Sequence, residues 1–336
     1  MRAAVYTGPG SIQLRDWPEP AAGPGELLLR VRGCGLCGSD LVKFVSGTVC
    51  PPAVFGHEVV GEVIGVGAGV TGFALDQRVV AAHHVPCFRC HYCRRGSPSM
   101  CRAFKESNLD PGGFAELCRV PAPNVAHAAF AIPEHLSDEA ASFTEPLACC
   151  LRAIRRAGLG QGDTALVVGL GSIGCLFVQS LRLRRVQVLG SDLVGERREL
   201  GRRFGAVVGE NEAALDGSLR EMTAARGADA VIITAGGAAV LPWAAARVRD
   251  GGALHYFAGG SGEALPLALD ALYHRELTVT ATYSSSPVDL AEAFALLAAG
   301  AVSADGLISH RLPLGRLADG IALMRRQEAV KVYVTP

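Results

Sequence analysis

Hydrophobic residues in the first part of the chain come in short runs that turn-forming residues separate. Runs rich in Val, Leu and Ile occupy residues 27–31, 59–66 and 78–82, and Gly and Pro stand near their ends. Apolar runs of this length between chain-breaking residues are typical of β-strands. The first part of the chain is therefore predicted to form an irregular β-barrel.

Near Thr164 the pattern changes to strands that alternate with helices. Helical spacing of apolar residues is found at 172–184 and 197–204. The predicted strands around these stretches are 165–168, 186–190, 206–208, 230–234, 253–257 and 277–281. Six short strands joined by helical crossovers predict a parallel, doubly wound sheet. The rest of the chain adds two helices and a strand, at 290–298, 317–326 and 331–334.

Length and composition narrow the classes of function. The 336 residues suggest about two domains. Because 32 basic residues balance 32 acidic ones, nothing favours nucleic acid or an anionic membrane as a partner. No apolar run reaches the ~18 residues of a membrane span, and Gly8 and Pro9 interrupt the first run, unlike in a signal peptide. We expect a cytoplasmic protein whose eleven cysteines bind metal in preference to forming disulfides.

A glycine-rich segment at residues 169–174 directly follows the apolar strand 165–168 and opens a helix. In a dinucleotide-binding turn the first glycine permits the tight turn, the second lets a pyrophosphate approach, and the third lets helix pack on strand. Phosphate then lies on free N–H groups at the helix N-terminus. Cofactor contacts are predicted at Gly169, Gly171, Ser172, Ile173 and Gly174. A second glycine-rich run, at 65–69, precedes no helix and is predicted to be a turn.

An acidic residue ends the second strand of the predicted parallel sheet. Asp192 lies 18 residues beyond Gly174, where a carboxylate would accept hydrogen bonds from the adenosine ribose and repel a 2′-phosphate. This position favours NAD over NADP; the alternative is an aspartate that only closes a surface turn. Arg197, which we also predict at the cofactor, and Arg198 soften this preference and leave NADP open.

Four cysteines fall within fifteen residues of one another. They are Cys87, Cys90, Cys93 and Cys101. Four thiolates at such short spacing can close a tetrahedral shell around Zn²⁺, which leaves no position for a substrate. We therefore predict a structural zinc site.

Two other motifs share part of this cysteine pattern. Cys87-x-x-Cys90-His91 matches the attachment site of c-type haem, but there is no export signal and two cysteines would stay unexplained. Nucleobase deaminases combine a similar cysteine pair with H-x-E, whereas His57 and Glu58 are adjacent here. Neither alternative accounts for all four cysteines.

A second, more dispersed set could form a catalytic metal site. Its members are Cys37, His57, Glu58 and Glu145. One thiolate, one imidazole and a carboxylate make a Lewis-acidic site with room for a water or substrate oxygen. Each residue alone is weak evidence, because a single Cys is commonly a small core residue. One alternative is a zinc ribbon that binds nucleic acid, which the zero net charge opposes. The other is a structural or redox-sensing protein, which the intact ligand set together with Ser39 opposes.

With these motifs in combination, the chain resembles the zinc-containing medium-chain dehydrogenases, specifically their sorbitol and threonine dehydrogenase-like branch, over essentially its whole length. The resemblance implies an α/β plus β architecture. A GroES-like β-barrel catalytic domain would comprise residues 1–150 and 288–336, with a structural-zinc lobe at 86–102. A Rossmann NAD(P)-binding domain would comprise residues 151–287, and the active site would lie in the cleft.

The resemblance also assigns roles to individual residues. Cys37 and His57 are implied as zinc ligands, and Glu58 and Glu145 as two carboxylates that bind or exchange on the metal. Alcohol dehydrogenases proper have Cys in place of Glu145, which is why the chain resembles the polyol branch. Ser39 is implied to take the substrate proton and pass it to the nicotinamide ribose.

Three further positions bear on the mechanism. Asp40 is implied to orient His57, and Lys331 to lie near the cofactor pyrophosphate. Many relatives have a relay His where this chain has Val42, so the proton would leave through water or another group such as Lys43.

The activity implied is hydride transfer between NAD(P) and a secondary alcohol of the polyol, sugar or aminocyclitol type. The alternative is biosynthetic reduction of a sugar-derived ketone. Two zinc ions are expected per chain. Relatives pair their Rossmann sheets edge to edge, which here predicts a homodimer or homotetramer formed through residues 277–281.

Overall fold

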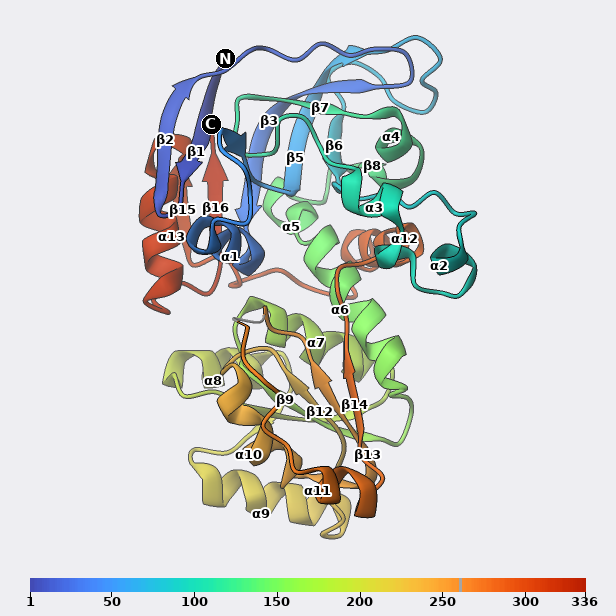
Figure 1. Cartoon of the computed structure of the whole chain (residues 1–336), viewed down its shortest axis with the longest axis vertical. Coiled ribbons are helices and arrows are strands. Elements are labelled where there is room, and N and C mark those ends of the chain that lie inside the picture. The colour runs from blue at the N-terminus through green and yellow to red at the C-terminus, as the bar shows by residue number, and fades with distance from the viewer. Residues whose placement is uncertain (260–261) are drawn as a thin grey trace. The chain divides into compact units, whose positions relative to one another are not determined.

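The computed structural model describes residues 1–259 and 262–336, which divide into two compact units (Figure 1). The first unit comprises Met1–Ala148 and Ser284–Pro336, and the second comprises Cys149–Tyr283. The expected boundaries, at 150/151 and 287/288, lie two and four residues from these limits. Segments from both parts of the chain that flank the second unit therefore build the first.

The first unit holds a seven-stranded sheet and a three-stranded sheet. The strands are β1 (Arg2–Gly8), β2 (Ser11–Asp16), β3 (Leu27–Leu36), β4 (Ala53–Val54), β5 (Glu58–Val66), β6 (Arg78–Ala81), β7 (Leu117–Val120), β8 (Ala129–Ala131), β15 (His310–Pro313) and β16 (Val332–Thr335). The larger sheet has the order β15-β16-β3-β5-β6-β8, with β7 also on β3, and the smaller has the order β2-β1-β4. All pairs except β15 with β16 are antiparallel.

Helices and short 3₁₀ turns connect these strands. They are α1 (Gly38–Ser46), α2 (His91–Arg94), η1 (Pro98–Met100), α3 (Arg102–Glu106), α4 (Ala122–Ala128), α5 (Asp138–Ser142), α12 (Pro287–Ala298), η3 (Leu314–Arg316) and α13 (Leu317–Arg325). Helix α6 (Thr144–Ala157) begins in the first unit and ends in the second. No helix among the described residues is both long and apolar enough to cross a membrane.

Strand β3 illustrates how the sequence forms the larger sheet. Leu27, Leu29 and Val31 are buried. Arg30 and Arg32 alternate with them, are exposed, and pair with acidic side chains. This period of two places one face of the strand in the core. The last four residues of β3 are all buried, and there β5 and β16 flank the strand on its two sides.

The second unit is built on one six-stranded sheet. Its strands are β9 (Thr164–Val168), β10 (Gln187–Ser191), β11 (Val207–Val208), β12 (Ala228–Ile233), β13 (Val248–Tyr256) and β14 (Thr278–Ala281). Its helices and 3₁₀ turn are α7 (Ser172–Leu183), α8 (Gly195–Arg203), α9 (Glu212–Thr223), η2 (Ala238–Val240), α10 (Leu241–Ala245) and α11 (Leu269–His274). The strand order is β11-β10-β9-β12-β13-β14 and every pair is parallel. This order confirms the predicted doubly wound Rossmann sheet.

The central strand β9 is buried at all five positions. Such a continuous apolar run is typical of a parallel strand covered on both faces. Strand β13 begins at Val248, five residues earlier than predicted. The sequence did not reveal this start because the early positions of β13 are polar or Gly, and the register with β12 shifts there. The glycine-rich run at 65–69 forms the predicted turn, where Gly69 has φ +83°.

Candidate active site

Cys37 lies at the junction between β3 and α1. It precedes the first turn of α1, and its backbone N–H donates to the Asp40 carboxylate over 3.1 Å. An acidic side chain three residues into a helix that binds back to the capping residue fixes the start of that helix. The sulfur of Cys37 is therefore carried by a well-defined corner of the fold.

His57 and Glu58 stand at the start of β5, on the strand next to β3. The antiparallel register pairs Glu58 with Gly35, two residues before Cys37. A Cβ atom at Gly35 would lie 1.8 Å from Oε2 of Glu58, so only glycine leaves room for this carboxylate. The sheet register thus brings residues 37 and 57–58 to the same place.

Three of the four predicted catalytic ligands converge in the structure. The sulfur of Cys37, a ring nitrogen of His57 and a carboxylate oxygen of Glu58 all lie within 4.8 Å of one another. Zn²⁺ holds such ligands at ~2.0–2.3 Å in a tetrahedral shell, which separates donor atoms by roughly 3–4 Å. The spacing and the chemistry of these three donors therefore fit zinc.

Asp40 supports the ring of His57. An oxygen of its fully buried carboxylate lies 3.4 Å from Nδ1 of His57. Burial raises the pKa of Asp40, but the nearby positive charges of His57 and Lys43 outweigh burial, so the pKa falls below its ordinary value. A carboxylate against the second nitrogen of a metal-binding imidazole fixes its orientation and tautomer.

Lys331 forms a buried ion pair with Glu58. Its Nζ lies 2.6 Å from Oε1 and 2.5 Å from Oε2 of Glu58, and the two residues are 3% and 1% exposed. Burial lowers the pKa of Lys331, but Glu58 more than offsets this, so the pKa lies above its ordinary value. Lys331 immediately precedes β16, which pairs with the end of β3. The ammonium thus engages a candidate metal ligand, and its expected contact with the cofactor pyrophosphate stays a prediction.

Glu145, the fourth predicted ligand, lies outside the group of three. It occupies the first turn of α6 and is 8% exposed. Burial raises the pKa of Glu58, and the negative charge of Glu145 adds to this effect against Lys331 and His57. The charge of Glu145 therefore acts on Glu58, although Glu145 does not belong to the group in which all donor atoms lie within 4.8 Å of one another.

The four cysteines of the predicted structural site also converge. The sulfur atoms of Cys87, Cys90, Cys93 and Cys101 lie within 4.8 Å of one another. The sulfurs of Cys90 and Cys93 are 3.5 Å apart, close to the ~3.8 Å expected between thiolates on a tetrahedral zinc with ~2.3 Å bonds. None of the eleven cysteines of the chain forms a disulfide. The lobe that contains α2, η1 and α3 therefore presents a closed set of four sulfur donors.

The glycine-rich segment joins β9 to α7 in the second unit. Gly169 has φ +91°, a conformation that favours glycine. A Cβ atom at Gly174 would lie 1.8 Å from the carbonyl oxygen of Gly169, whereas one at Gly171 would meet nothing within 4 Å. The third glycine therefore permits close packing of helix on strand. The second leaves open space before Ser172 and Ile173, where α7 begins.

Comparison with known proteins decides the family. Residues 23–133 match the family model described as alcohol dehydrogenase GroES-like domain, and residues 172–299 match that of zinc-binding dehydrogenases. The chain is 31% identical to D-altritol 5-dehydrogenase from Agrobacterium fabrum, over 94% of each chain. It is 27% identical to sorbitol dehydrogenase from Halalkalibacterium halodurans, over 100% of this chain and 99% of the relative.

The chain belongs to the zinc-dependent medium-chain dehydrogenase family. A solved relative, acetophenone reductase from Geotrichum candidum in complex with NAD, superposes with a TM-score of 0.86 at 25% identity, over 100% of this chain and 97% of the other. The protein is accordingly an enzyme, a zinc-dependent oxidoreductase that acts with a nicotinamide cofactor.

In this dehydrogenase Asp192 follows β10 and faces the glycine-rich turn. Its Oδ2 accepts a hydrogen bond from the backbone N–H of Leu170 at 2.7 Å, and its Oδ1 accepts one from Val194 at 2.9 Å. Arg198 donates to the backbone carbonyl of Asp192, and Arg197 lies half-buried in α8. The carboxylate thus closes a turn and stands beside the predicted pyrophosphate site, so its contact with ribose stays a prediction.

Sequence reasoning missed His83, which lies against the metal site of the dehydrogenase. The ring centroids of His83 and His57 are 4.6 Å apart, and His83 is 8% exposed. Strand β6 pairs with β5 so that Ala81 faces Val59. Residues just after β6 therefore lie next to residues just before β5. That strand pairing was the signal that could have located His83.

Two predicted mechanistic positions lie on α1. Ser39 is exposed in the first turn, and Val42 is 43% exposed. Val42 offers no titratable group, as the sequence implies.

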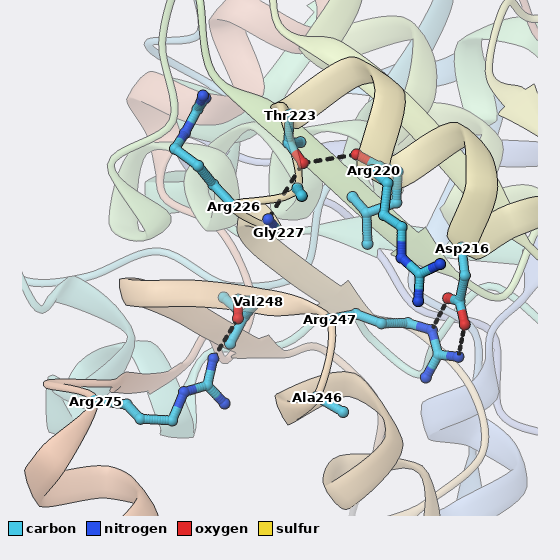
Figure 2. A pocket seen from close by; sticks show the side chains of 11 residues that line it. Asp216, Arg220, Thr223, Arg226, Gly227, Ala246, Arg247, Val248 and Arg275 are labelled. Atoms are coloured by element: carbon cyan, nitrogen blue, oxygen red, sulfur yellow. Dashed lines mark hydrogen bonds and ion pairs between the residues drawn. The ribbon is translucent and has the colours of Figure 1, made fainter.

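The second unit of the dehydrogenase has an arginine-lined cavity of about 250 Å³ at the end of α9. Figure 2 shows Arg247 bound to both carboxylate oxygens of Asp216, at 2.8 and 2.9 Å, and Arg275 donating to the carbonyl of Val248. None of the predicted cofactor residues lines it. Arg247 and Arg275 thus bind groups of the protein itself.

Proposed function

We propose that this dehydrogenase oxidises a secondary alcohol of a polyol, sugar or aminocyclitol to the ketone and transfers the hydride to NAD. The convergence of donor atoms from Cys37, His57 and Glu58 carries the proposal. Three protein ligands leave a tetrahedral site open for a substrate oxygen. Relatives named for sorbitol and D-altritol support a polyhydroxylated substrate.

The chemistry divides between the metal and the protein. Zinc, when bound, supplies the Lewis acidity that makes an alcohol acidic near neutral pH. Ser39, two residues after Cys37, takes the hydroxyl proton, and Asp40 holds His57 in place. The N-terminus of α7 at Gly171 binds the cofactor pyrophosphate through its free N–H groups. Glu145 serves as the second carboxylate that exchanges at the site.

We further propose two zinc ions per chain, since each of the two donor sets suits one ion. NAD is preferred because Asp192 would repel a 2′-phosphate. A measured preference for NADP would instead indicate that Arg197 binds the 2′-phosphate. Two copies pair through β14, which is the edge strand of the Rossmann sheet and leaves one row of backbone groups for a partner strand. A reducing cytoplasm suits cysteines that bind zinc.

The test combines activity with metal analysis. Zinc-loaded protein should reduce NAD⁺ with at least one member of a panel of polyols and sugars, and elemental analysis should give two zinc ions per chain. Cys37→Ser should stay folded, retain one zinc and lose activity, whereas Cys50→Ser, at an exposed cysteine, should match the unaltered protein. Failure of the zinc-loaded protein to oxidise any panel member would refute the proposal, and so would full activity of Cys37→Ser.

The proton step is tested separately. Ser39→Ala should lower turnover by about 10²–10⁴-fold, the usual contribution of acid–base groups, with cofactor affinity close to normal. Ser46→Ala, at the exposed last residue of the same helix, is the matched control. Unchanged turnover in Ser39→Ala would mean that solvent handles the proton.

A further inference from the structure

A cavity of about 280 Å³ in the first unit reaches the candidate zinc site. His57 forms part of its wall, together with His83, Lys43 and Asn108. Its volume lies near the lower end of the ~300–1,000 Å³ typical of ligand pockets, which suits a small molecule. A substrate whose oxygen binds at the metal could therefore extend into this cavity.

Lys43 supplies the one ammonium group among the residues that line the cavity. Lys43 is half-buried, and among the described residues it has no ion-pair partner. Asp110 is the one acidic residue of the lining, and Arg119 binds its carboxylate at 2.8 and 3.1 Å. The negative charge of Asp110 is thus already matched. Lys43 also follows Ser39 by four residues on α1, so both side chains lie on the same helix face.

Two neutral groups in the wall can add hydrogen bonds. Nδ1 of His83 is buried and has no hydrogen-bond partner in the described part of the chain. A buried polar atom without a partner costs free energy unless a ligand or water satisfies it. The side-chain oxygen of Asn108 accepts from the N–H of Leu109 at 3.0 Å, which leaves its amide N–H groups able to donate.

We propose that the substrate is a polyhydroxylated acid, and that Lys43, His83 and Asn108 bind its carboxylate while its carbinol lies at the zinc site. This inference rests on the proposed secondary-alcohol dehydrogenase activity. A carboxylate matches the unpaired ammonium and accepts from the neighbouring donors, since charge-assisted hydrogen bonds are roughly twice as strong as neutral ones. A neutral polyol would fill the same space and leave the ammonium unmatched.

The experiment compares sugar acids with polyols of the same carbon skeleton and carbinol configuration. For the zinc-loaded enzyme, kcat/KM should be higher for the acid. Lys43→Met should raise KM for the acid by about 10–100-fold, the usual range for a hydrogen bond to a charged group. The same change should raise KM for the acid more than KM for the polyol, so that the preference for the acid is lost. Lys43→Arg should retain most of the affinity for the acid. Lys105→Met, at an exposed lysine of α3, is the control for loss of a positive charge.

The outcomes separate this inference from the proposed function. Oxidation of polyols with no preference for acids, or equal effects of Lys43→Met on both substrates, would overturn the inference and leave the dehydrogenase activity standing. A fall in kcat for both substrates in Lys43→Met would assign Lys43 to proton exit and also overturn it. If neither acids nor polyols are oxidised, both proposals fail. Thermal unfolding of each variant checks that the fold is intact.

Discussion

Replacing Lys331 with Met should strongly destabilise the metal-free first unit. At 2.6 Å from Oε1 of Glu58, and with an effective dielectric constant of ~20, the attraction between the two charges is about 6 kcal/mol. The cost of burying both charges offsets much of this attraction. Removal of one partner leaves the other charge buried without a counter-charge or water. Such a change costs about 3–5 kcal/mol, a large share of the ~5–15 kcal/mol that stabilises a typical domain.

Zinc should reduce this loss. A cation held by Cys37, His57 and Glu58 supplies positive charge beside the Glu58 carboxylate when Lys331 is missing. The variant should therefore be closer to the unaltered protein when zinc-loaded than when zinc has been removed by a chelator. A double variant, Lys331→Met with Glu58→Gln, should recover part of the stability of the metal-free protein, because no unpaired charge remains buried.

The two tryptophans allow the first unit to be followed by itself. Trp17 belongs to the first unit and Trp243 to the second, so in a Trp243→Phe background the fluorescence reports the first unit alone. Urea unfolding in this background gives the free energy for each variant. Lys105→Met, at an exposed position, should change it by no more than about 0.5 kcal/mol. A loss below about 1 kcal/mol for Lys331→Met in metal-free protein would refute the argument from burial.

Two further predictions concern the second unit. Asp192→Ser should shift the ratio of dissociation constants towards NADPH by about tenfold, or ~1.4 kcal/mol; tighter binding of NADPH than NADH by the unaltered protein, measured by titration, would contradict the role of Asp192. His255 is fully buried between the hydroxyls of Thr280 and Thr282, and burial lowers its pKa to about 4. Because the unfolded imidazole titrates near 6.5, its contribution to stability is complete above that pH and is lost as pH falls towards 4. Between pH 7 and 5 metal-free protein should therefore lose about 2 kcal/mol more than His255→Asn, and equal losses in urea unfolding would count against this.

Local patterns predicted the parts of the fold that local residues determine. Strand β9 is apolar from Ala165 to Val168, and the turn after it needs glycine for steric reasons, so both could be predicted from the sequence. The first residues of β13 could not be predicted, because Arg249 and Asp250 belong to a strand only through tertiary structure. The partnership of Lys331 with Glu58 joins positions 273 residues apart, and no periodicity encodes it.

The site shows the same division. Residue types and their order indicated Cys37 and His57, because few side chains bind zinc. The position of Glu145 outside the donor group depends on where α6 starts, and α6 was not predicted because Pro146 follows its first residues; proline is tolerated in the first turn of a helix. His83 was not predicted because it reaches the metal site through the pairing of β5 with β6. Sequence spacing does not reveal that pairing.

The pairing of β3 with β16 sets an order of events during synthesis of the chain. About 300 residues separate the two strands, and at about 5–20 residues/s a ribosome needs roughly 15–60 s to make them. Throughout that interval one edge of β3 lacks its partner, and the Glu58 carboxylate lacks the ammonium of Lys331. The Rossmann unit, whose strands end at Ala281, can fold earlier because all of its residues emerge before β16 does. Acquisition of the catalytic metal is therefore expected to come last, after the nascent chain has delivered β16 to a sheet begun about 300 residues before.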